Sequence, residues 1–240
     1  MRMGRYFLPG QPLHVIQRGN NRQPIFFTHQ DAVNFLTWLN EAAARHRVAI
    51  HAYVLMPNHI HLLASPETAT SLPRAMQSLG RRYVRHINGR LQRTGTLWDG
   101  RYRATVVDTD KYFFQCSRYI ELNPVRANLA ADPGAYRWSS YHANALGKAD
   151  ALVTPHALFA SLGVDDRRRS AAYREMFSDP VPPATIDAIR AATNGGWALG
   201  DNGFRARVAG ASGRRVQPLQ RGRPRLGGVA DTPNTRAFLE

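Results

Sequence analysis

The sequence has few of the features that define several large classes of protein. It holds one cysteine, Cys116, which excludes an internal disulfide framework and a zinc site built from cysteines. Its longest apolar runs, such as Val48 to Met56, are far shorter than a membrane-spanning helix, and its first residues lack the apolar segment of a signal peptide. We therefore expect a cytoplasmic protein without a membrane partner, in which any metal is bound by histidine, amide or carboxylate side chains.

Acidic residues are also scarce. The 240 residues contain 17 Asp and Glu against 32 Lys and Arg, a net charge of +15. All the basic residues except Lys111 and Lys148 are arginine, whose planar guanidinium pairs with phosphate and stacks on bases. Between positions 74 and 103 the arginines are opposed only by Asp99. This surplus predicts a nucleic-acid partner; a solvated arginine surface in the product of a GC-rich genome is the alternative.

The apolar pattern predicts a compact α+β domain. Strands are expected at 13–17, 48–55, 60–63 and 98–107, and helices at 29–45, 71–91 and 110–122, with Thr28 and Asp108 or Thr109 available as N-caps. The order β-α-β-β-α-β-α is that of an antiparallel sheet with helices on one face. We expect the other face to be open for chemistry.

The sequence pattern changes after about residue 146. Weaker helical segments at 157–162 and 167–177 lead into the proline-rich residues 180–183, which we interpret as a linker, and into a short helix at 185–193. The last residues are rich in Arg, Gly and Pro. We therefore expect three parts: a compact domain over 1–145, a helical extension over 146–209 and a flexible basic tail over 210–240.

Two histidines are candidates for metal binding. His59 and His61 lie two residues apart on a predicted strand, so both imidazoles leave one face while Ile60 and Leu62 point into the core. Two neutral imidazoles side by side are half of a divalent-metal site. A packed pair or a surface pair of histidines is the alternative.

A tyrosine and an asparagine could complete such a site. Tyr119 and Asn123 are four residues apart and lie on one face of a predicted helix. A nearby cation can orient a phosphodiester and offset developing negative charge, which suits cutting a strand through a phosphotyrosine. The alternative is a core aromatic residue beside an asparagine that ends the helix before Pro124.

Four segments together resemble a known family. They are HVIQRGNNR at 14–22, MPNHIHLL at 56–63, LWDGRY at 97–102 and RYIELNPVR at 118–126. In this order they are similar to signatures of the REP-associated tyrosine transposases, within the HUH class of single-strand transposases. The resemblance covers roughly residues 5 to 145 and implies that 1–145 is a catalytic domain with a ferredoxin-like fold.

The resemblance also implies a reaction. Members of this family bind Mg²⁺ or Mn²⁺ through the positions of His59 and His61 and cut single-stranded DNA that contains hairpins, here expected to be REP-like repeats. Tyr119 matches the nucleophile, which becomes joined to the 5′ phosphate and releases a 3′ hydroxyl. Asn123 falls where related insertion-sequence enzymes have a glutamine ligand, and asparagine is one methylene shorter. The acting species would be a monomer or a homodimer.

Arginines are the expected DNA contacts. A channel for backbone phosphates is expected from Arg18, Arg81, Arg82, Arg85, Arg101 and Arg103. Tyr83, Trp98 and Tyr102 could stack on bases, with burial in the core as the alternative. In the tail, Arg221 and Arg223 belong to QRGRPR, which is similar to a minor-groove-binding AT-hook; a non-specific basic tail is the other interpretation.

Three functions follow in decreasing order of support. The first is a metal-dependent DNA transposase that nicks and rejoins hairpin-containing single strands through Tyr119. The second is a DNA- or RNA-binding regulator on the same fold that does not cut. The third is a metallohydrolase of the amidohydrolase type, which we rank last because such enzymes need a barrel of about 250 residues.

Overall fold

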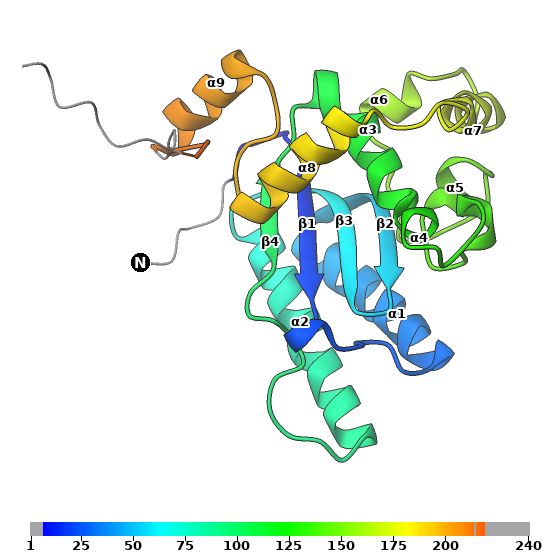
Figure 1. Ribbon diagram of the computed structural model, residues 1–240, viewed down its shortest axis with the longest axis vertical. Helices are drawn as coiled ribbons and strands as arrows, with labels where there is room; N and C mark the ends of the chain where they lie inside the picture. Colours follow the sequence, from blue (N-terminus) through cyan, green and yellow to red (C-terminus); the bar gives the residue numbers. More distant parts are fainter. Residues whose placement is uncertain (1–6, 214, 219–240) are drawn as a thin grey trace, which may run out of the picture.

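A four-stranded antiparallel sheet lies at the centre of the molecule (Figure 1). The computed structural model describes residues 7–213 and 215–218. The strands have the spatial order β2-β3-β1-β4 and span Leu13–Arg18 (β1), Val48–Met56 (β2), His59–Pro66 (β3) and Arg103–Val106 (β4). All three neighbouring pairs are antiparallel. The α+β class and the ferredoxin-like strand order are therefore confirmed.

Strand register decides which residues share a face. In the β1–β3 pair, Ile16 lies opposite His61 and Arg18 lies opposite His59. Residues directly opposite in an antiparallel pair point to the same side of the sheet. The two histidines of β3 therefore share a face with alternate residues of β1, whereas Ile60 and Leu62, both fully buried, point to the other side.

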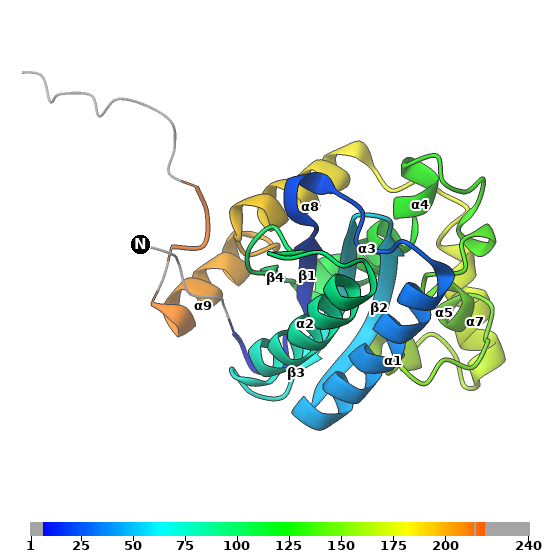
Figure 2. The same ribbon diagram turned by 90° about the horizontal axis from the view of Figure 1, so that it is seen from below.

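One face of the sheet is covered by α1 (His29–His46) and α2 (Ser71–Arg90), which lie side by side in Figure 2. The first helix begins where the sequence predicts, because Thr28 and Asp31 form a reciprocal capping box. Both helices bury their apolar stripes against alternate strand residues such as Leu13 and Val15, and together they make the larger hydrophobic core.

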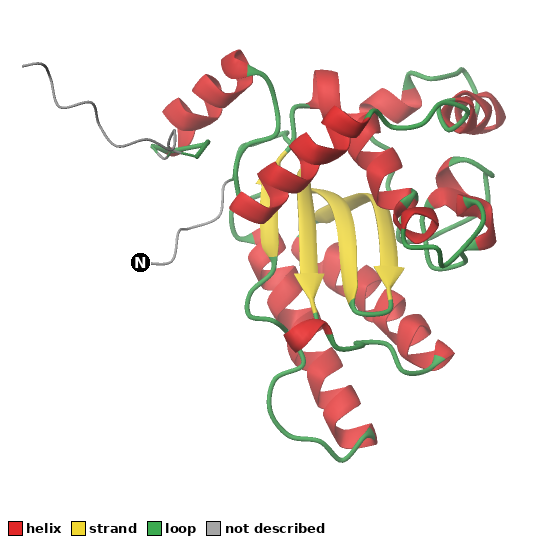
Figure 3. Cartoon of the chain, in the orientation of Figure 1, coloured by secondary structure: helices red, strands yellow, loops and turns green. Residues whose placement is uncertain are grey.

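The other face of the sheet is covered as well, which corrects the expectation that helices lie on one face only. In Figure 3, α3 (Thr109–Glu121) and α8 (Pro183–Gly195) cross in front of the strands. Phe113 and Ile120 pack with Val54 and Leu63 in a second core. The physical reason lies in β2, whose residues are buried on both sides and so require cover on both faces.

Shorter elements complete the described chain. They are α4 (Asn123–Arg126), α5 (Tyr141–Asn144), α6 (Ala157–Ala160), α7 (Asp166–Glu175), α9 (Asn202–Ser212) and two 3₁₀ turns at Asn20–Arg22 and Pro133–Ala135. The segment after residue 146 packs on the sheet domain: the amide of Leu199 donates to the carbonyl of Val106 at 2.8 Å. The last of these helices continues to Ser212, past the expected start of the tail. None of the described helices has the length and apolar character needed to span a bilayer.

The fourth strand is shorter than predicted. We expected it over 98–107, but β4 begins at Arg103 and residues 98–102 form a loop. Gly100 in that loop has φ of +75°, a conformation that interrupts a strand and that glycine adopts without strain. The loop carries Trp98 and Tyr102 toward α2.

Candidate active site

Three histidines meet on the face of the sheet that α3 and α8 cover. The ring centroids of His59 and His61 lie 5.0 Å apart. His14, from the neighbouring strand β1, stacks on His61 with centroids 5.1 Å apart, and its Nε2 lies 2.8 Å from Nδ1 of His61. The paired histidines expected from the sequence thus have a third partner, which their spacing did not indicate; only the β1–β3 register brings it there.

A chain of hydrogen bonds fixes the tautomers of two of these histidines. Thr193, on α8, donates its hydroxyl proton to the carbonyl of Ile189 at 2.6 Å, since a carbonyl can only accept. Its oxygen, 3.0 Å from Nδ1 of His14, must then accept a proton from that nitrogen. Neutral His14 is left with a lone pair on Nε2, which accepts from Nδ1 of His61. The lone pair of His61 is consequently on Nε2.

His59 is held in the same tautomer as His61. Its Nδ1 lies 2.6 Å from Oδ1 of Asn58, whose amide nitrogen donates to the carbonyl of Arg22. The amide oxygen is an acceptor, so Nδ1 of His59 carries the proton and Nε2 carries the lone pair. Such fixing of the far nitrogen is the usual support of a metal-binding histidine.

Burial keeps the three imidazoles neutral. It lowers the pKa of His14 to about 3 and, together with the charge of Arg18, that of His59 to about 4. The pKa of His61 is well below its ordinary value through burial and then through its neighbours, among them His14, His59 and Arg126. Neutral imidazole is the form that binds metals.

Tyr119 lies against this histidine cluster. Its ring is edge-on to His14 and to His61, with centroid separations of 5.8 and 5.9 Å, and the residue is 6% exposed. Arg126, on α4, places its guanidinium carbon 4.3 Å from the centroid of the tyrosine ring and donates to the Tyr119 carbonyl. The predicted nucleophile and the two predicted metal ligands are therefore together.

Asn123 has a structural task at the end of α3. Its amide nitrogen donates to the carbonyls of Tyr119, at 3.1 Å, and Ile120, at 3.3 Å. The amide oxygen is the part of the side chain left for a metal. Within residues 7–213 and 215–218, no three His, Cys, Asp or Glu side chains are grouped as a complete metal site. His14 cannot serve as a ligand because both its nitrogens are engaged, which leaves Nε2 of His59 and Nε2 of His61 as the imidazole nitrogens open to a divalent ion.

Two arginines lie near the cluster. Arg18 is opposite His59 in the strand register, and Arg126 covers Tyr119; both charges act on His61. The sequence analysis named Arg18 but missed Arg126, although it lies within the quoted segment 118–126. The position of Arg126, seven residues after the tyrosine and beyond the end of α3, is the signal that could have identified it.

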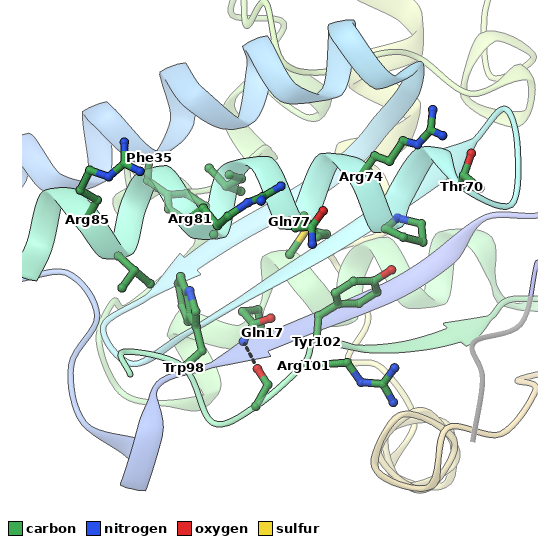
Figure 4. Close-up of a pocket in the computed structure, with 16 residues that line it drawn as sticks. Gln17, Phe35, Thr70, Arg74, Gln77, Arg81, Arg85, Trp98, Arg101 and Tyr102 are labelled. Carbon is green, nitrogen blue, oxygen red and sulfur yellow. Dashed lines mark hydrogen bonds between the residues drawn. The ribbon is translucent and has the colours of Figure 1, made fainter. Parts of the chain in front are cut away.

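The other predicted DNA-binding arginines separate into two groups. Arg81, Arg85 and Arg101, together with Arg74, line a pocket between α2 and the loop 98–102 (Figure 4). Arg82 instead pairs with Glu41 and lies over the ring of Trp38, while Arg103 donates to the carbonyl of Asn194 at 3.1 Å. Arg221 and Arg223 lie outside the described residues.

The three aromatic residues considered for base stacking also differ. Trp98 and Tyr102 line the pocket of Figure 4. Tyr83 is fully buried and donates its hydroxyl to the carbonyl of Ile25 at 2.7 Å. Tyr83 is therefore a core residue, and only the other two remain available to a ligand.

Comparison with known proteins identifies the first half of the chain. A family model described as "Transposase IS200 like" matches residues 10–123. This segment is similar to the IS200-like transposases. It contains Tyr119 and Asn123 as well as all three histidines of the cluster. The match confirms the resemblance to the transposases and supports a role in DNA transposition, and the four-stranded sheet is not the barrel that the amidohydrolase alternative needs.

One solved structure shows the same fold. The REP-associated tyrosine transposase bound to a REP hairpin is 18% identical, with a TM-score of 0.52, over 65% of this chain and 92% of that chain. A putative transposase from Deinococcus radiodurans R1 is 20% identical, with a TM-score of 0.35, over 54% of this chain and 92% of that one. The comparison with curated proteins gives no significant match.

Proposed function

We propose that this transposase nicks and rejoins hairpin-containing single-stranded DNA through a covalent 5′-phosphotyrosine on Tyr119. The observation that carries the proposal is the meeting of three groups: the centroid of the Tyr119 ring lies 5.9 Å from that of His61, and among the described residues no donor takes up the Nε2 lone pair of His61 or of His59. A phenol beside two neutral, oriented imidazoles is what a metal-assisted transesterification needs.

In the proposed reaction one phosphodiester bond is exchanged for another, so no cofactor is consumed. The phenol oxygen of Tyr119 attacks phosphorus, the bond from phosphorus to the 3′ oxygen breaks, and the 5′ phosphate becomes joined to the tyrosine. The phenol releases one proton to water, and the departing 3′ oxygen takes one up. Attack by a 3′ hydroxyl on the phosphotyrosine reverses these steps and rejoins a strand, so the energy of the original phosphodiester is kept.

His59 and His61 would hold a Mg²⁺ or Mn²⁺ ion through Nε2, with the amide oxygen of Asn123 as a further ligand. When bound, such an ion polarises the phosphate and offsets the negative charge that develops on its oxygens. The protein's own part is to present both imidazoles in one tautomer and one protonation state, through Asn58 on one side and His14 on the other.

Arg18 and Arg126 would bind the phosphates that flank the cleavage point. Because Arg126 covers the Tyr119 ring and the tyrosine is 6% exposed, we expect the guanidinium to leave the ring and pair with phosphate when the strand arrives. The partner would be a REP-like hairpin, as in the related structure, acted on in the cytoplasm by a monomer or homodimer. Arg221 and Arg223 would add contacts from the tail.

A denaturing gel tests the proposal. Purified protein is incubated with a pool of end-labelled single-stranded hairpins, with and without Mn²⁺, beside Tyr119→Phe and Tyr112→Phe. Tyr112 lies on the same helix, so its variant is a matched control for loss of a hydroxyl. We expect a metal-dependent, protease-sensitive adduct with the unchanged protein and with Tyr112→Phe, and none with Tyr119→Phe. Hairpin binding without cleavage, whether or not Mn²⁺ is present, would favour the non-cutting regulator.

A further inference from the structure

A second candidate site lies on the opposite face of the sheet from the histidines. The pocket between α2 and the loop 98–102 has a volume of about 730 Å³ (Figure 4). Gln17 of β1 reaches it because alternate residues of that strand point away from the face that carries Arg18. Nothing in the chemistry proposed for Tyr119 uses this pocket.

The lining of the pocket combines an apolar interior with cations at its edge. Met76, Leu79 and Trp98 supply apolar surface, and the arginines at 74, 81, 85 and 101 lie around them (Figure 4). Walls of this kind suit a flat, uncharged aromatic group, whereas guanidinium groups suit phosphate. Both chemistries occur together in a nucleotide of a single strand, where the base is free to leave the stack.

The polar groups inside the pocket also match a base edge. The indole nitrogen of Trp98 is buried, and within the part of the chain that the structure describes it has no hydrogen-bond partner. A buried donor of this kind is costly unless a ligand accepts from it. Gln17 donates its amide nitrogen to the carbonyl of Gly100 at 3.2 Å, so the group that it can offer a ligand is its amide oxygen. Among its polar groups the pocket thus includes a donor on Trp98 and an acceptor on Gln17.

We propose that this pocket binds an unpaired base of the single-stranded part of the DNA substrate, with the surrounding arginines on the adjacent phosphates. The inference rests on the proposed function only in taking single-stranded DNA as the substrate. Because the pocket and Tyr119 lie on opposite faces of the sheet, the captured base is several nucleotides from the phosphate that is cut. The pocket would therefore select and hold the strand without taking part in the chemistry.

Two glycines of α2 allow a matched test. A Cβ at Gly80, which lines the pocket, would meet only the indole nitrogen of Trp98, at 3.6 Å, so a leucine there fills the pocket without striking the backbone. A Cβ at Gly89 would meet nothing within 4 Å. Both substitutions replace a helical glycine by a better helix former, so Gly89→Leu controls for the change in helix stability.

The experiment measures binding without cleavage. Each substitution is made in full-length Tyr119→Phe protein, and fluorescence anisotropy is recorded with a labelled hairpin that carries a single-stranded tail of mixed bases or an abasic tail. We expect Gly80→Leu to weaken binding of the mixed-base tail by about tenfold or more, the scale of one stacked base, and Gly89→Leu to leave it unchanged. The abasic tail should bind the Tyr119→Phe protein and its Gly80→Leu derivative equally weakly.

Other outcomes separate the two proposals. Equal binding of the two tails by Tyr119→Phe, or full binding by Gly80→Leu, overturns the base pocket even if the unchanged protein cuts DNA. Base-dependent binding that Gly80→Leu removes upholds the pocket even if no adduct ever forms, in which case only the phosphotyrosine mechanism fails. If Tyr119→Phe binds neither tail, the pocket proposal is wrong, because it requires an unpaired base to contribute to affinity.

Discussion

The two faces of the sheet are made by the same strands, and helices cover both, but β1 and β3 present different side chains to each face. Leu13, Val15 and Leu62 face α1 and α2 and are almost wholly buried in an apolar core. Their immediate neighbours His14 and His61 face α3 and α8 and form a buried polar cluster. A shift of one residue in strand register would exchange the two sets. Because successive side chains of a strand point to opposite faces, the apolar core and the histidine cluster lie on opposite sides of the same strands.

Burial of side chains also has a different effect on stability on the two faces. Each large apolar side chain buried under α1 and α2 stabilises the fold by about 1.5–3 kcal/mol. On the other face, burial has to be offset for every polar atom, and His14 achieves this by using both its nitrogens. We therefore expect substitutions in the apolar core of the first face to alter stability and those in the histidine cluster of the second face to alter function.

The largest expected effect comes from replacing His61, a proposed metal ligand on the polar face. We expect His61→Asn to reduce metal-dependent nicking by about a thousandfold or more, since it removes one of two imidazoles that would hold the ion. His51→Asn is the control: His51 is a buried histidine of β2 that bonds Thr154 and Ser65, away from the cluster. A gel assay of adduct formation measures both. Undiminished nicking by His61→Asn would contradict the proposed metal site.

The adjacent residue tests the apolar face. Leu62 is fully buried in the core beneath α1 and α2, and we expect Leu62→Ala to lower the free energy of unfolding by about 2–5 kcal/mol. Urea unfolding followed by circular dichroism gives this value. The fraction that stays folded should nick DNA at the normal rate. If folded Leu62→Ala were as inactive as His61→Asn, the two faces would not be functionally separate.

A second buried polar network provides a pH test. Burial raises the pKa of Glu121 to about 7, against the opposing effect of hydrogen bonds from Ser140, Asn144 and Tyr173. Between pH 4.5, the ordinary pKa of a glutamate, and about pH 7, Glu121 is protonated in the folded protein and ionised in the unfolded chain. The folded protein therefore binds more protons in this range, and its stability falls as the pH rises through it. We expect a loss of about 3 kcal/mol.

The Glu121→Gln variant isolates this contribution, because an amide does not titrate. Urea unfolding measured at about pH 5 and about pH 7.5 should show the loss in the unchanged protein and a smaller one in the variant. Equal pH dependence in the two proteins would mean that Glu121 is not the group responsible.

The smallest expected effect comes from the far end of the histidine hydrogen-bond chain. Thr193→Val keeps the shape of the side chain and removes the hydroxyl that accepts from His14. We expect Mn²⁺ affinity, measured by calorimetry in Tyr119→Phe protein, to fall about 10- to 100-fold, as for other residues that orient metal ligands. Thr193→Ser should restore it. Equal Mn²⁺ affinity in the valine and serine variants would show that the hydroxyl does not orient His61.

Local patterns predicted much of this molecule. The capping residue Thr28 placed the start of α1, and the two-residue period put His59 and His61 on one face with Leu62 on the other. The resemblance of segments 56–63 and 118–126 supplied Tyr119, which the structure brings to the histidines. These features depend on neighbours in sequence, so spacing and turn residues were enough to find them.

The rest depends on contacts between distant parts of the chain. His14 is 47 residues from His61, and only strand pairing brings them together. The cover over the second face of the sheet was missed because helix α8 comes from a segment with weak periodicity. The shortening of β4 was missed because alternation continues through residues 98–102, although Gly100 breaks the strand.

The position of Thr193 in the chain has a consequence for the timing of synthesis. It lies 179 residues after His14, beyond the whole segment that matches the transposase family. A ribosome that has just made residue 123 has supplied the tyrosine and all three histidines, but not the hydroxyl at the end of their hydrogen-bond chain. The residues proposed to cut DNA therefore receive the last hydrogen bond of their supporting chain only after residue 193 has been made.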